Sequence, residues 1–86
     1  MKERSLHQMI PVGQLSQREF TRRLRSLVDF VQDPENRYLE PERFAESYSR
    51  IVKLAALYPD YFEKKYIVHN LGKNRIGYIE QLMGED

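Results

Sequence analysis

Two histidines and no cysteine limit the metal and acid–base chemistry open to this 86-residue sequence. His7 lies near the start and His69 in the last third, which leaves too few ligands for a zinc site. His69 beside Asn70 has the chemistry of a general base, but no nucleophile motif accompanies it, and a lone histidine near an apolar face is more often a packing residue. We therefore expect no metal, no small-molecule cofactor and no catalytic residue, and so a protein that is not an enzyme.

The segment His69 to Asn74 brings Gly72 and Lys73 together before an expected helix, as some phosphate-binding loops do. A loop of the G-x-x-x-x-G-K-[ST] type needs an earlier glycine, a following serine or threonine and a preceding buried strand, and this segment lacks all three. A glycine with positive φ at the end of a helix explains Gly72 instead. We expect no phosphate loop here.

A row of arginines is the clearest candidate for binding anions. Arg18, Arg22 and Arg25, with Arg23 near the flank, would lie along about two turns of one exposed helix face, at a spacing suited to phosphates. Asp29 follows Arg25 by four residues and would partly neutralise the row. The net charge of +1, from 14 basic and 13 acidic residues, gives no overall field to attract nucleic acid. Solvated surface, a nucleic-acid interface and a surface for an acidic protein all remain open.

The helix that would carry this row is expected from Ser16 to Gln32. Ser16 and Glu19 have the spacing of a capping box, and Leu15 and Phe20 have the spacing of a hydrophobic staple. Its apolar positions repeat with the helical period and predict one buried face. They are Phe20, Leu24, Leu27, Val28 and Val31, with Phe30 at the edge.

A second helix is expected from Pro41 to Tyr58, and the rest of the chain would be organised around it. Proline suits the first helical position, and Pro59 prevents easy continuation. Its short connection to the first helix, residues 33–40, predicts antiparallel neighbours, with Tyr38 and Leu39 closing one end of the core. Its predicted buried stripe consists of Phe44, Tyr48, Ile51, Val52, Ala55 and Tyr58.

Two further helices are expected after Pro59. The segment Asp60 to Leu71 has no clean apolar face, and we favour a helix over a short strand because no pairing partner for a strand is evident. Asn74 would cap a last helix through Met83, which Gly77 would weaken. In that helix we expect Ile76, Ile79 and Met83 in the core and Leu82 at its margin.

These elements predict an all-α fold, a small bundle of three to four helices, with an extended N-terminal arm. Residues 1–14 would form the arm and residues 15–86 a single helical domain. The absence of cysteine fits a reducing compartment, and no apolar run approaches the roughly 20 residues needed to cross a bilayer. We expect a cytoplasmic protein without a membrane partner.

The apolar and aromatic residues exceed what one small core needs, which favours a non-enzymatic interaction module, an adaptor or regulator. It would bind another protein, or itself as a homodimer, because Leu54 and Leu57 lie off the buried stripe of their helix. The residues expected to bind protein are Leu54, Leu57, Tyr61 and Ile67. The alternative is a nucleic-acid-binding protein that uses Arg18, Arg22, Arg23 and Arg25.

Overall fold

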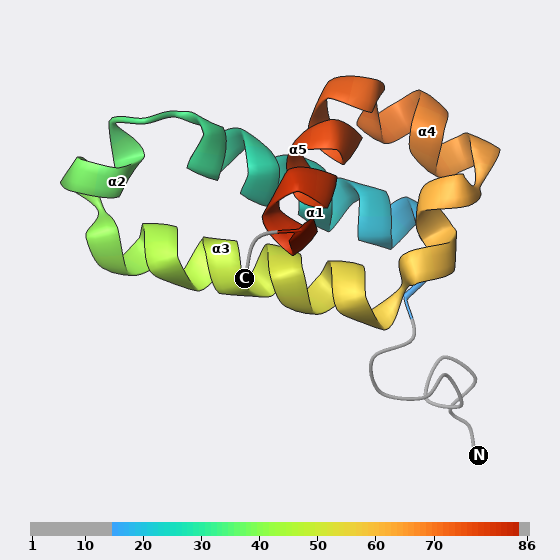
Figure 1. Ribbon diagram of the computed structural model, residues 1–86, viewed down its shortest axis with the longest axis horizontal. Helices are drawn as coiled ribbons and strands as arrows, with labels where there is room; N and C mark the ends of the chain where they lie inside the picture. The colour runs from blue at the N-terminus through green and yellow to red at the C-terminus, as the bar shows by residue number, and fades with distance from the viewer. Residues whose placement is uncertain (1–14, 85–86) are drawn as a thin grey trace, which may run out of the picture.

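A computed structural model of the chain describes residues 15–84, and this part of the chain contains helices and no strand (Figure 1). The predicted all-α class is therefore confirmed. The N-terminal arm predicted for residues 1–14 lies outside the described residues. In chain order the elements are α1 (Gln17–Gln32), α2 (Asn36–Leu39), α3 (Pro41–Leu57), the 3₁₀ helix η2 (Pro59–Glu63), α4 (Lys65–Leu71) and α5 (Lys73–Gly84).

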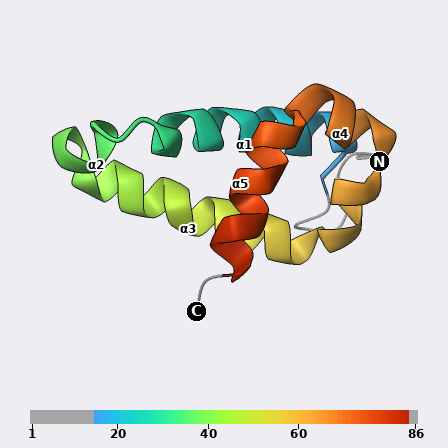
Figure 2. The same ribbon diagram turned by 45° about the horizontal axis from the view of Figure 1, so that its top comes forward.

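The two long helices, α1 and α3, form an antiparallel hairpin (Figure 1). The short α2 joins them at one end, as the brief connection predicts. At the other end η2 leads the chain into α4, which packs against α1. Helix α5 then crosses the hairpin and contacts both of its helices (Figure 2).

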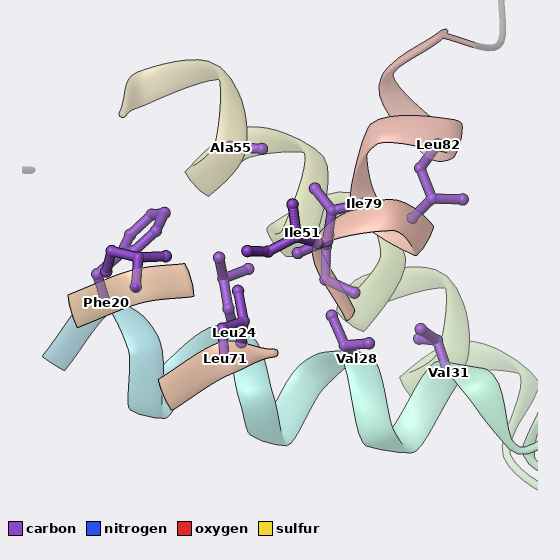
Figure 3. Close-up of a cluster of buried hydrophobic side chains, with 11 residues drawn as sticks. Phe20, Leu24, Val28, Val31, Ile51, Ala55, Leu71, Ile79 and Leu82 are labelled. Atoms are coloured by element: carbon purple, nitrogen blue, oxygen red, sulfur yellow. The ribbon is translucent and has the colours of Figure 1, made fainter. Parts of the chain in front are cut away.

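The core lies where α1, α3, α4 and α5 meet (Figure 3). Its buried side chains are Phe20, Leu24, Val28 and Val31 from α1, Ile51 and Ala55 from α3, Ile67 and Leu71 from α4, and Ile76, Ile79 and Leu82 from α5. Most of the predicted α1 stripe is thus buried. The α3 stripe is buried at its centre only. Leu27 of α1 and Phe44, Tyr48, Val52 and Tyr58 of the α3 stripe are only partly buried.

The segment expected as one helix over residues 60–71 is divided at Lys64. This residue has an extended backbone, with φ −78° and ψ 138°, so η2 ends and α4 begins in a new direction. The change of direction explains why the segment has no single apolar face, because η2 and α4 meet the core separately. The preference for helix over strand is confirmed, but the single uninterrupted helix is wrong.

The assignment of Met83 to the core and Leu82 to its margin is also wrong. Leu82 is buried, whereas Met83 is 41% exposed. The buried residues of α5, Ile76, Ile79 and Leu82, follow a row with a spacing of three, which is inclined by about 45° to a helix axis. A helix that crosses its neighbours, as α5 does, buries such an inclined row (Figure 2).

Tyr38 and Leu39 do not close the core. Their exposed fractions are 81% and 72%. They lie in α2, at the end of the hairpin that is remote from α4 (Figure 1). Helix α5 crosses nearer the middle of the hairpin (Figure 2), so neither of the last two helices covers α2.

An aromatic cluster closes the opposite end of the hairpin. The Phe20 ring lies edge-on to the rings of Tyr58, Tyr61 and Phe62, at centroid distances of 5.3, 4.9 and 5.7 Å. The Leu15 backbone N–H donates to Tyr58 Oη at 2.7 Å, and Tyr61 Oη donates to the Leu15 carbonyl oxygen at 2.5 Å. The two hydroxyls therefore hold the chain just before α1 begins.

We expect Tyr58→Phe and Tyr61→Phe each to lower the free energy of unfolding by about 1 kcal/mol, because each removes one hydrogen bond to the Leu15 backbone. Urea denaturation followed by circular dichroism measures the loss. Tyr66→Phe is the matched control, since the exposed Tyr66 hydroxyl makes no hydrogen bond within residues 15–84. If both variants are as stable as this control, the hydroxyls do not hold Leu15.

Candidate functional site

A groove with a volume of about 730 Å³ lies between α1 and α3. Its lining comes from these two helices alone. We call it the hairpin groove. It is lined by Arg22, Arg23, Ser26 and Leu27 of α1 and by Arg50, Lys53, Leu54 and Leu57 of α3.

Helical spacing brings these residues to one groove. On α1, Arg23 and Leu27 are four residues apart, so they lie one above the other on the same face. On α3, Arg50, Leu54 and Leu57 follow a spacing of four and then three, which again defines one face. Because the helices are antiparallel neighbours, these two faces line the same groove.

The floor of the hairpin groove is apolar. Leu27 and Leu54 are partly buried and pack against the edge of the core. Leu57 is 59% exposed, which makes it one of the few large apolar side chains that face solvent among residues 15–84. An exposed leucine alone needs no explanation, but one that extends an apolar floor inside a groove is typical of a contact surface.

The rim of the groove is basic. Arg22 and Arg23 lie on the α1 side, and Arg50 and Lys53 lie on the α3 side. No acidic side chain is part of the lining. The groove therefore has cationic side chains on both sides of an apolar floor, and these side chains attract anions.

Glu19 already pairs with the α1 side of the rim. Its carboxylate accepts from Arg22 Nη2 at 2.7 and 2.8 Å and from Arg23 Nε at 2.9 Å. Hydrogen bonds from Arg23 and then Arg22 hold the pKa of the Glu19 carboxyl below its usual range. Ser16 Oγ accepts from the Glu19 backbone N–H at 3.1 Å, as predicted for the helix start. In a complete capping box the Glu19 carboxylate would also accept from the Ser16 backbone N–H. This second hydrogen bond is not formed among the described residues, because the Glu19 carboxylate binds Arg22 and Arg23 instead.

The α3 side of the rim is held more loosely. Arg50 Nη2 lies 3.6 Å from Glu46 Oε2, and both side chains are largely exposed, so this ion pair has little strength. Lys53 pairs with no carboxylate in the part of the chain that the structure describes. Two of the four rim cations are thus available to an incoming anion.

The four residues expected to bind protein do not lie on one surface of the structure. Leu54 and Leu57 line the hairpin groove. Tyr61 is turned toward the aromatic cluster and the Leu15 carbonyl. Ile67 is fully buried in the core, so its assignment to a binding surface is wrong. The break at Lys64 turns α4 so that Ile67 points inward.

The predicted arginine row is also divided. Arg22 and Arg23 line the hairpin groove, whereas Arg18 and Arg25 do not. Asp29, expected to neutralise Arg25, pairs instead with Arg75 of α5, at 2.8 and 3.0 Å. This pair ties α1 to α5, and Arg75 Nη1 also donates to the Leu71 carbonyl oxygen at 2.9 Å. Asp29 therefore has a structural role.

Sequence reasoning missed half of the groove. From the sequence, no binding role is expected for Arg50, Lys53 or Ser26, and Leu27 is expected in the core stripe. A signal was present, because Arg50 and Lys53 share one side of α3 with Leu54 and Leu57. The leucines could have marked that side as a mixed basic and apolar surface.

The other candidates considered from the sequence, His69 and the segment around Gly72, lie outside the hairpin groove. His69 is exposed on α4. Residues 15–84 contain no group of three or more histidine, cysteine or acidic side chains arranged to hold a metal ion. Gly72 ends α4 with φ 94°, as predicted for a glycine that ends a helix. Another hollow, of about 420 Å³, lies beside Phe44 near α2.

Comparison of the chain with models of protein families, with curated proteins and with solved structures found no match. Within residues 15–84, every helix is too short or too polar to cross a membrane. The geometry of the hairpin groove therefore carries the functional argument.

Proposed function

We propose that this helical domain is a non-enzymatic interaction module, an adaptor or regulator, that binds another protein through the hairpin groove. The observation that carries the proposal is the apolar floor of Leu27, Leu54 and Leu57 between two long helices, with Leu57 more than half exposed. Covering this floor removes apolar surface from water, which drives most protein association. We keep the cytoplasm as the proposed location, on the sequence argument alone.

A partner other than a second copy of this chain fits the groove better. A twofold dimer built groove to groove would bring two basic rims together. Like charges that face each other across an interface cost several kcal/mol. Self-association therefore remains a weaker prediction, and sedimentation of the purified chain measures it directly.

Nucleic acid is the competing prediction, and it depends on the arginine row of α1, of which only Arg22 and Arg23 line the groove. Arg18 and Arg25 pair with no carboxylate among the described residues, which leaves them available to phosphates. Arg22 and Arg23, however, share one carboxylate, Glu19, and this reduces their attraction for phosphates. The apolar floor between the cations also has no role in binding a phosphate backbone.

Site-directed photo-crosslinking tests the proposed function. A photoreactive amino acid is placed at position 57 in the groove and, as a matched control, at position 39 in α2, which is equally apolar and more exposed. We expect a defined protein adduct from position 57 in source cells, absent from position 39 and lost when Leu54→Glu is added. Identical adducts from both positions, or adducts that persist with Leu54→Glu, would contradict the proposal.

A further inference from the structure

The shape of the hairpin groove limits what can occupy it. Two antiparallel helices leave between them a channel of the kind that a third helix fills in a bundle. The channel follows Arg50 to Leu57 on α3, which is about 10 Å or two helical turns. A helix that lies in a groove offers apolar side chains at positions i, i+3 or i+4, and i+7. The three leucines of the floor suit such a row.

The charge of the rim limits the occupant further. Two cations border the floor on the α1 side and two on the α3 side. A helix seated between them places the residues that flank its apolar row next to both sides of the rim. Carboxylates at these flanking positions would be attracted on both sides, while lysine or arginine would be repelled.

Glu19 provides an internal example of this recognition. A single carboxylate engages Arg22 through Nε and Nη2 and Arg23 through Nε. The geometry of the α1 side therefore suits a carboxylate group, and bidentate pairing is the preferred mode of arginine with carboxylates. The same contact makes Glu19 a competitor for any carboxylate that arrives from outside.

We infer that the occupant of the hairpin groove is an amphipathic helix of a partner protein, with leucine-like residues along one face and acidic residues on both flanks. Glu19 competes with a partner carboxylate for Arg22 and Arg23 and weakens binding until it is displaced. This inference rests on the proposed function and specifies the class of partner. Arg50 and Lys53 are paired with carboxylates less strongly than Arg22 and Arg23 are. They therefore make the first contact with the acidic flank.

Synthetic peptides test the inference with the full chain. The probe is a peptide of about 15 residues with leucines at i, i+3 and i+7 and glutamates on both flanks, and the matched probe has lysine at each glutamate position. We expect the acidic peptide to bind at least roughly 10-fold more tightly in fluorescence anisotropy. The double change Arg50→Glu with Lys53→Glu should reverse this preference.

Replacing Glu19 examines its competing role. Glu19→Gln should tighten binding of the acidic peptide by roughly two- to fivefold, since it frees Arg22 and Arg23. Glu42→Gln is the matched control, because Glu42 also lies in the first turn of a helix but pairs with neither Arg22 nor Arg23. Equal affinities of the parent chain, Glu19→Gln and Glu42→Gln would overturn the role of Glu19.

The outcomes separate this inference from the proposed function. If both peptides bind equally and Leu57→Glu weakens both, the groove binds protein and only the acidic class of partner is refuted. If Leu57→Glu leaves peptide binding unchanged, the proposed function itself fails. No binding at millimolar peptide overturns the inference. So does preferred binding of single-stranded DNA or phosphatidylserine vesicles that the double charge change at residues 50 and 53 abolishes.

Discussion

Phe20→Ala is expected to lower the free energy of unfolding by about 3 to 5 kcal/mol, the usual range for a fully buried phenylalanine. Phe20 has no exposed surface, and its ring contacts three other aromatic rings. Edge-on ring pairs add about 0.5 to 1.5 kcal/mol each beyond their buried area. Alanine would leave a cavity where α1, η2 and the end of α3 meet. A small domain has only about 5 to 15 kcal/mol in total, so the variant should be close to unfolding.

Urea denaturation of Phe20→Ala beside Phe30→Ala measures this effect. Phe30 is partly buried on the same helix, and the Arg43 guanidinium lies over its ring at 4.2 Å. We expect a clearly smaller loss for Phe30→Ala, because the Phe30 side chain is only partly buried. Equal losses for the two variants would show that the aromatic cluster does not have the importance for stability that its geometry indicates.

The second prediction with a large effect compares the stability loss at a core residue with that at a groove residue. Ile67→Ala should cost about 2 to 5 kcal/mol, because Ile67 is fully buried between helices. Leu57→Ala should change stability by no more than about 0.5 kcal/mol, because most of Leu57 is exposed. Both residues were expected on one binding surface from the sequence. Thermal or urea unfolding of the two variants distinguishes the roles, and a larger loss for Leu57→Ala would contradict the structure.

The sequence was sufficient for features that depend on local spacing. The S-x-x-E start at Ser16 and the period of Phe20, Leu24 and Val28 defined α1, and two prolines bounded α3. These signals report short-range chemistry, such as a side-chain cap or a missing backbone N–H. The two long helices and most of the core were therefore predictable.

The groove was not predictable as a whole, because it depends on the rotation of α1 against α3. Arg22 and Leu57 are far apart in the sequence, and only the hairpin brings them to one surface. The inward position of Ile67 likewise follows from the extended backbone at Lys64, which no local pattern indicated. Such relations are tertiary, and a single sequence gives no measure of them.

The leucine methyl NMR spectrum of the chain, recorded with and without the partner captured through position 57, tests the central claim most directly. We predict that the methyl signals of Leu27, Leu54 and Leu57 shift on binding, while those of the buried Leu24 and the exposed Leu39 stay in place. Shifts confined to Leu39, or a spectrum in which the three groove leucines do not move, would contradict the claim that the hairpin groove is the protein-binding surface.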